Sequence, residues 1–125
     1  MKLASIVNPK FTVCFDKLLK EELPILTAYK LKKITSIVES EQKKFEELRQ
    51  ELVKKFSKKN KKGEPHKNEG GFYSVDKDKM EDFLKELKTL LDVEVEVPKI
   101  KISDLGNELK ISAEQAIALD GILEE

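Results

Sequence analysis

The stretch from Pro24 to Phe56 constrains the fold more than any other part of the chain, because it contains no glycine and no second proline. Large side chains, nearly all apolar, recur along it at steps of three or four residues, at Leu31, Ile34, Val38, Glu41, Phe45, Leu48, Leu52 and Phe56. That period is typical of one face of an α-helix. The spacing predicts a single helix from Pro24 to about Phe56, roughly 50 Å long at ~1.5 Å per residue.

A shorter helix is predicted after a polar loop. Residues 57–75 are rich in Lys, Gly and Asn and nearly free of aliphatic side chains, which predicts a flexible loop with a hairpin turn at Gly70-Gly71. Asp78 and Glu81 have the spacing of a helix N-cap pair. Apolar residues then follow with a helical period, at Met80, Phe83, Leu84, Leu87, Leu90 and Leu91. We expect this helix to fold back antiparallel on the first.

Alternating side chains at both ends of the chain indicate strands. Phe11, Val13 and Phe15 alternate with smaller residues, so residues 1–15 are predicted to form one or two strands broken at Asn8-Pro9. Residues 93–102 alternate Val or Ile with charged residues, and the alternation changes register at Pro98. We expect an edge strand with a bulge or break there.

Two short helical segments complete the prediction. Asp16 is expected to cap a helical turn over residues 17–20. Ser112 and Gln115 have the spacing of a capping box, which predicts a C-terminal helix over residues 113–123. The fold class is therefore α+β, with a long antiparallel helical hairpin, a small β-sheet from the N-terminal and 93–102 segments, and a short C-terminal helix. A length of 125 residues predicts one domain over 1–125.

The composition favours binding over catalysis. The chain has one His and one Cys, and none of its glycines has the spacing of a Rossmann or P-loop motif. His66 lies in the Lys-rich loop without a second His or Cys beside it, which favours a solvated side chain over a metal ligand. We predict a protein that is not an enzyme and has no catalytic residue, cofactor or metal.

The charge pattern leaves only local anion-binding candidates. Lys and Arg number 24, as do Asp and Glu, so the net charge gives no global attraction to nucleic acid or to a membrane. A local run of lysines provides the candidate anion contacts Lys54, Lys55, Lys58, Lys59, Lys61, Lys62 and Lys67. A solvated loop is the favoured interpretation, with phosphate or nucleic-acid contact and an acidic protein partner as the alternatives.

The surplus length of the first helix favours self-association. The second helix is too short to cover the whole apolar stripe, so part of it is expected to face another subunit. The candidate interface residues are Leu31, Ile34, Val38, Phe45, Leu48, Leu52 and Phe56. Cys14, which lies between Val13 and Phe15, predicts a buried thiol and a reducing, intracellular compartment. No run of 18 apolar residues predicts a membrane span, and no export signal is expected.

The layout of the chain resembles a family of uncharacterised small proteins from bacteriophages of low-GC Gram-positive bacteria. The resemblance rests on the two helices, on the segments Lys62-Gly63-Glu64-Pro65 and Gly71-Phe72-Tyr73, on residues 93–97 and on the Ser112-Ala113-Glu114 helix start. It implies a phage protein in the host bacterial cytoplasm. The favoured function is a binding protein that engages a host protein or sequesters a small ligand to counter host defence. The alternatives are a virion assembly factor and a nucleic-acid accessory protein that uses the Lys-rich loop.

Overall fold

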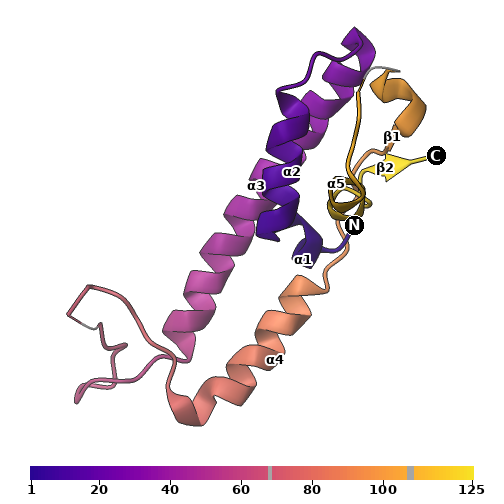
Figure 1. Ribbon diagram of the computed structural model, residues 1–125. Helices are drawn as coiled ribbons and strands as arrows, with labels where there is room; N and C mark the ends of the chain where they lie inside the picture. The colour runs from indigo at the N-terminus through magenta and orange to yellow at the C-terminus, as the bar shows by residue number, and fades with distance from the viewer. Residues whose placement is uncertain (68, 107–108) are drawn as a thin grey trace. The chain divides into compact units, whose positions relative to one another are not determined.

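The computed structural model describes residues 1–67, 69–106 and 109–125, and helices dominate these segments (Figure 1). The elements in chain order are α1 (Leu3–Ile6), α2 (Pro9–Leu19), α3 (Ile25–Lys55), the 3₁₀ turn η1 (Lys77–Lys79), α4 (Met80–Leu91), β1 (Ile100–Lys101), the 3₁₀ turn η2 (Ile102–Leu105), α5 (Ala113–Ala118) and β2 (Leu123–Glu124). The residues form two compact units. The first unit comprises Met1–Gln42 and Val93–Glu125, and the second unit comprises Lys43–Asp92. The α+β class is confirmed, and the association of both units into one domain stays a prediction.

The N-terminal segment is helical, so the prediction of strands over residues 1–15 is wrong. Asn8 caps α2 by accepting a hydrogen bond from the Lys10 N–H at 2.9 Å, and Pro9 occupies the first helical position. Proline is favoured there because the missing N–H would have no helical partner. The predicted cap at Asp16 is also wrong, because that residue lies inside α2.

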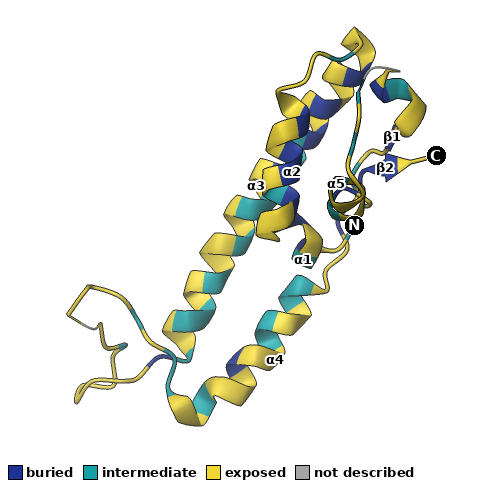
Figure 2. Ribbon diagram, viewed as in Figure 1, coloured by how far each residue is buried: buried dark blue, intermediate teal, exposed yellow. Residues whose placement is uncertain are grey.

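The core of the first unit combines buried side chains from α1, α2, the N-terminal part of α3 and residues 95–123 (Figure 2). The amide of Gln42 ties this part of α3 to the N-terminus by donating to the Ile6 carbonyl (3.1 Å) and to Thr12 Oγ1 (3.3 Å). The buried apolar residues of the first unit are Leu3, Ile6, Phe11, Cys14, Phe15, Leu18, Leu31, Ile34, Val38, Val95, Ile100, Leu105, Leu119, Ile122 and Leu123. Burial of the Cys14 thiol is thereby confirmed.

The sheet differs from the predicted one. β1 pairs with β2 in parallel, with Ile100 opposite Leu123. The N-terminus contributes only an antiparallel bridge between Lys2 and Glu94, in which the Leu3 N–H donates to the Val93 carbonyl at 2.9 Å. The predicted sheet is therefore confirmed in part: residues 93–102 contain β1 and form the bridge to Lys2, but most of the N-terminal residues are helical and the partner of β1 is β2.

Several helix boundaries differ by a few residues from those predicted. α3 begins at Ile25 rather than Pro24, although the Pro24 carbonyl accepts a helical hydrogen bond from the Ala28 N–H. The capping box of α5 is confirmed, with the Ser112 hydroxyl accepting from the Gln115 N–H at 3.1 Å, yet this helix ends at Ala118. Its predicted last residue, Leu123, belongs to β2 instead.

The second unit contains the C-terminal part of α3, the Lys-rich loop and α4. Asp76 caps η1, because its carboxylate accepts from the Asp78 N–H at 3.1 Å, and the residue before α4 is Lys79, whose side chain makes no cap hydrogen bond. The predicted cap at Asp78 is therefore wrong. Isolated antiparallel bridges within the loop pair Ser57 with Val75, Lys59 with Pro65 and Lys67 with Tyr73. The last of these brackets the predicted turn at Gly70-Gly71.

Candidate binding surfaces

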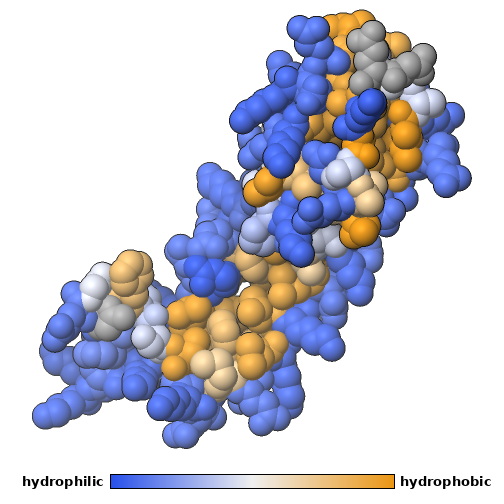
Figure 3. Space-filling model, in the orientation of Figure 1, coloured by the Kyte–Doolittle hydropathy of each residue, from blue (hydrophilic) through white to orange (hydrophobic). Residues whose placement is uncertain are grey.

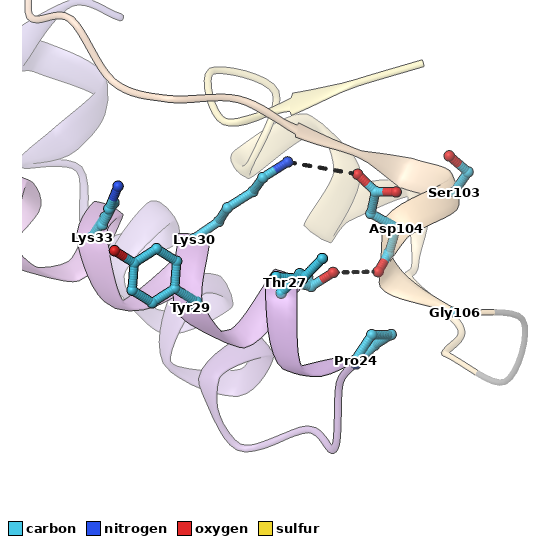
Figure 4. Close-up of a pocket in the computed structure, with 9 residues that line it drawn as sticks. Pro24, Thr27, Tyr29, Lys30, Lys33, Ser103, Asp104 and Gly106 are labelled. Carbon is cyan, nitrogen blue, oxygen red and sulfur yellow. Dashed lines mark hydrogen bonds and ion pairs between the residues drawn. The ribbon is translucent and has the colours of Figure 1, made fainter.

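A pocket in the first unit lies where α3 begins (Figure 4). It has a volume of about 640 Å³ and is lined by Pro24, Leu26, Thr27, Tyr29, Lys30, Lys33, Ser103, Asp104 and Gly106. The Thr27 hydroxyl, 3% exposed as a residue, donates to the Asp104 carbonyl at 2.6 Å. This hydrogen bond fixes η2 against the first turns of α3 and shapes the pocket.

The charged groups of this pocket are only loosely paired. Lys30 Nζ lies 3.9 Å from Asp104 Oδ2, which is longer than a hydrogen bond, and both side chains are close to half exposed. Lys33 Nζ lies 4.8 Å from the centre of the Tyr29 ring, within the range of a cation–π contact. The pocket therefore offers ammonium groups to an incoming anion.

Sequence reasoning did not identify this pocket. Leu26, Lys30 and Lys33 are spaced by three or four residues and share a helix face, which is a visible signal. The position of Asp104 against that face depends on the tertiary structure, so no local pattern could reveal it.

A second candidate surface is the open apolar face of the second unit. Among the described residues of this unit, Phe83 is the one buried apolar side chain. Leu48, Met80 and Leu84 are 43%, 40% and 53% exposed. Figure 3 shows apolar side chains gathered on one face over α4 and the C-terminal part of α3. A helix pair normally needs a further layer to bury such a face.

The predicted interface residues separate into two groups. The structure buries Leu31, Ile34 and Val38 in the core of the first unit, so they are not available to a partner. The second group belongs to the second unit and stays at least partly exposed, at Phe45, Leu48, Leu52 and Phe56. The whole stripe on α3 is periodic, which is why the sequence alone could not separate these groups.

The candidate anion-contact lysines do not converge on one point. Lys55 forms an ion pair with Glu86 at 3.0 Å. Lys54 and Lys67 both lie near the Tyr73 ring, at 5.9 and 5.4 Å from its centre. The remaining lysines of the set are exposed, and no ion pair involves them in the described segments: Lys58, Lys59, Lys61 and Lys62.

The cavity beside Tyr73 has a volume of about 720 Å³ but a balanced charge. Arg49, Lys54 and Lys67 supply its cations, and Glu46, Glu47 and Glu51 supply as many carboxylates. Arg49 is already engaged, because its guanidinium donates to both carboxylate oxygens of Glu46. This balance gives a phosphate backbone little net attraction at the cavity itself.

The described residues contain no cluster of three or more His, Cys, Asp or Glu side chains that could hold a metal ion. His66 is exposed in the loop. Within residues 1–67, 69–106 and 109–125, no helix combines the length and the apolar character needed to cross a membrane.

No protein-family model, curated protein or solved structure matches the chain. The function is therefore inferred from the pocket of the first unit and the apolar face of the second unit.

Proposed function

We propose that this chain is a non-enzymatic binding protein that works as a homo-oligomer, with the apolar face of the second unit seated on a second copy. One observation carries the proposal, namely the exposure of the apolar residues of α4. Met80, Leu84, Leu87 and Leu91 follow one another at steps of four, three and four residues. This is the spacing of a helix that packs along a second helix.

The width of the apolar face of α4 supports contacts on two sides. Phe83 packs edge-to-face against Phe56, with the ring centres 6.4 Å apart, and Glu86 pairs with Lys55. These contacts support the predicted antiparallel hairpin between α4 and the end of α3. The stripe through Leu84 lies beside Phe83 on the helix surface and needs another partner.

The charges beside the stripe favour a second copy in antiparallel orientation. α4 has Glu81 and Asp82 in its first turn and Lys88 in its last turn. A two-fold axis near the middle of α4 places Leu84 opposite Leu87 of the other copy, and Glu81 near Lys88 of the other copy. A two-fold interface must be complementary to itself, and this arrangement of charges meets that condition.

The phage setting rests on the resemblance alone. In that setting the oligomer acts in the bacterial cytoplasm, where it engages a host protein or sequesters a small ligand to counter host defence. Recovery with virion proteins from infected cells would favour the assembly role instead.

Light scattering with mass readout at micromolar concentration tests the proposal. We expect a mass of at least twice 14.3 kDa for the natural chain. Replacement of Leu84 by Glu should weaken association by roughly tenfold or more, because burial of a leucine contributes about 1.5–3 kcal/mol. Thr89→Glu on the opposite face of α4 is the matched control and should leave the mass unchanged. A monomer of 14.3 kDa for the natural chain would refute the proposal.

A charge exchange tests the orientation of the two copies. Glu81→Lys and Lys88→Glu should each weaken association, because each places like charges opposite one another across the two-fold axis. The double variant should restore it. If the double variant associates no better than either single variant, the antiparallel arrangement is wrong.

A further inference from the structure

The pocket at the start of α3 has the features of a recognition site for an acidic apolar peptide. It belongs to the first unit, so it is independent of the apolar face of the second unit. Its volume of about 640 Å³ lies within the range typical of ligand sites.

Its rim carries large apolar side chains that the protein leaves in solvent. Leu26 and Tyr29 are 74% and 58% exposed, and the neighbouring Ile25 is 82% exposed. A single exposed leucine is ordinary on a protein surface. A group of such residues beside a cavity is characteristic of an interaction site.

Its base is held in place before any ligand arrives. Thr27 bonds the Asp104 carbonyl at 2.6 Å, and Leu105, next in the chain, is 4% exposed. Gly106 follows with a φ of +92°, a conformation that strains residues with a Cβ, so the sequence is adapted to this turn. A preformed pocket loses less entropy when it binds a ligand.

Its charge sets the chemistry of the ligand. Figure 4 shows Lys30 and Lys33 on the same side of α3 as Tyr29, with Lys30 directed toward Asp104. Among the described residues that line the pocket, Asp104 is the one acidic side chain, against these two lysines. Because the Lys30–Asp104 separation is 3.9 Å, a ligand carboxylate can approach Lys30 more closely than Asp104 does.

We propose that this pocket binds a peptide segment of a partner protein in which an aliphatic side chain stands beside a carboxylate. The aliphatic group packs on Leu26 and on the Tyr29 ring. The carboxylate lies between the ammonium groups of Lys30 and Lys33. The partner segment is thus apolar and acidic, and a basic segment is repelled.

A matched pair of peptides tests the charge requirement. The probes are N-acetyl-Ser-Leu-Glu-Leu-Ser-amide and the same peptide with Gln in place of Glu, each titrated into the ¹⁵N-labelled full chain. We expect saturable shifts of the Thr27, Lys30 and Lys33 amides, and binding of the Glu peptide about threefold or more tighter, as for partly exposed ion pairs. Equal affinity for both peptides, or no shift at these amides, would overturn the proposal.

Variants of the chain locate the binding site. Lys30→Gln combined with Lys33→Gln should abolish the preference for the Glu peptide, whereas Lys32→Gln should preserve it, because Lys32 is exposed on the same helix but does not line the pocket. Leu26→Ser should weaken both peptides. If the preference survives the double replacement, the carboxylate binds elsewhere and the proposal fails.

A third probe distinguishes a peptide from a small apolar acid. Hexanoate carries the same pairing of aliphatic chain and carboxylate without a peptide backbone. Weaker binding of hexanoate than of the Glu peptide supports a peptide ligand, and binding as tight or tighter refutes it. The Leu84→Glu variant keeps this pocket, so peptide binding by that variant is independent of the outcome for self-association.

Discussion

The carboxylate of Glu46 is the clearest electrostatic feature among the described side chains. Arg49 Nε donates to it at 3.0 Å, and Gln50 Nε2 adds a bond at 3.2 Å. The hydrogen bonds from Arg49 are the largest cause that lowers the pKa of Glu46 below 4.5, and the same pair raises the pKa of Arg49. A lowered carboxyl pKa means that this pair stabilises the fold above pH 4.5 and loses its effect as the pH falls through the lowered value.

Replacement of Arg49 by Gln should therefore return the pKa of Glu46 toward 4.5, because it removes the main hydrogen-bond donor. An NMR titration of the Glu46 carboxyl carbon measures this change directly. Gln50→Ala is the control and should raise the pKa less, since its hydrogen bond is a smaller cause. An unchanged Glu46 pKa in the Arg49→Gln variant would show that the pair does not persist in solution.

Single residues of the candidate sites were only partly predictable from the sequence. The sequence identified the lysine run as a set, but it could not show that Lys55 is neutralised by Glu86, a residue far along the chain. It likewise gave no indication that the side chains of Lys54 and Lys67 both lie near the Tyr73 ring. Such pairings depend on tertiary proximity, whereas sequence patterns report only local spacing.

Among the elements, α2 shows how two periods can compete within one segment. Phe11, Val13 and Phe15 alternate as in a strand, yet Phe11, Cys14, Phe15 and Leu18 also fit a helix. Val13 decides between the periods, because it is 54% exposed whereas Cys14 is buried. The missed signal was Asn8-Pro9, which is a favoured helix start as well as a strand break. α3 and α4 were predicted correctly because only the helical period fits them.

Replacement of Asn8 by Ala should lower the free energy of unfolding by about 1 kcal/mol, because it removes the acceptor for the Lys10 N–H at the start of α2. Urea denaturation followed by circular dichroism measures the change. Asn8→Ser retains a capping oxygen and should stay within a few tenths of a kcal/mol of the natural chain. If the serine variant loses as much stability as the alanine variant, Asn8 acts through something other than its cap.

At the scale of the whole molecule, burial is unevenly distributed between the units. Among the described residues, the first unit contains every buried apolar side chain except Phe83, which belongs to the second unit. Figure 2 shows most of the buried residues in the elements of the first unit. The uniform period of α3 predicted one continuous helix correctly, but it did not show that its apolar stripe changes from core to surface. Whether an apolar stripe is buried depends on the elements that pack against the helix, and the sequence of the helix does not specify these elements.

Hydrogen exchange should reveal this asymmetry. We expect the amides of α4 to gain protection as the protein concentration rises, because association covers the Leu84 stripe, while the amides of α2 stay equally protected throughout. Exchange measured by mass spectrometry at submicromolar and high micromolar concentration provides the comparison. Leu84→Glu should remove the concentration dependence of α4. Protection of α4 that is independent of concentration in the natural chain would contradict self-association through that helix.

The pairing of Met1 with Val95 has a consequence for the order in which the chain folds during synthesis. The Met1 amino group donates to the Val95 carbonyl, 94 positions later in the sequence. β1 pairs with β2, which is synthesised later still. The ribosome therefore synthesises Leu31, Ile34 and Val38 well before residues 93–125, which complete the first unit. The second unit consists of residues 43–92 alone, so its internal contacts join residues that are close in sequence. Contacts between residues close in sequence form faster than long-range contacts. All residues that form the contacts of the second unit are therefore synthesised before the last residues of the first unit, and the buried side chains of the first unit stay without their C-terminal partners for longer.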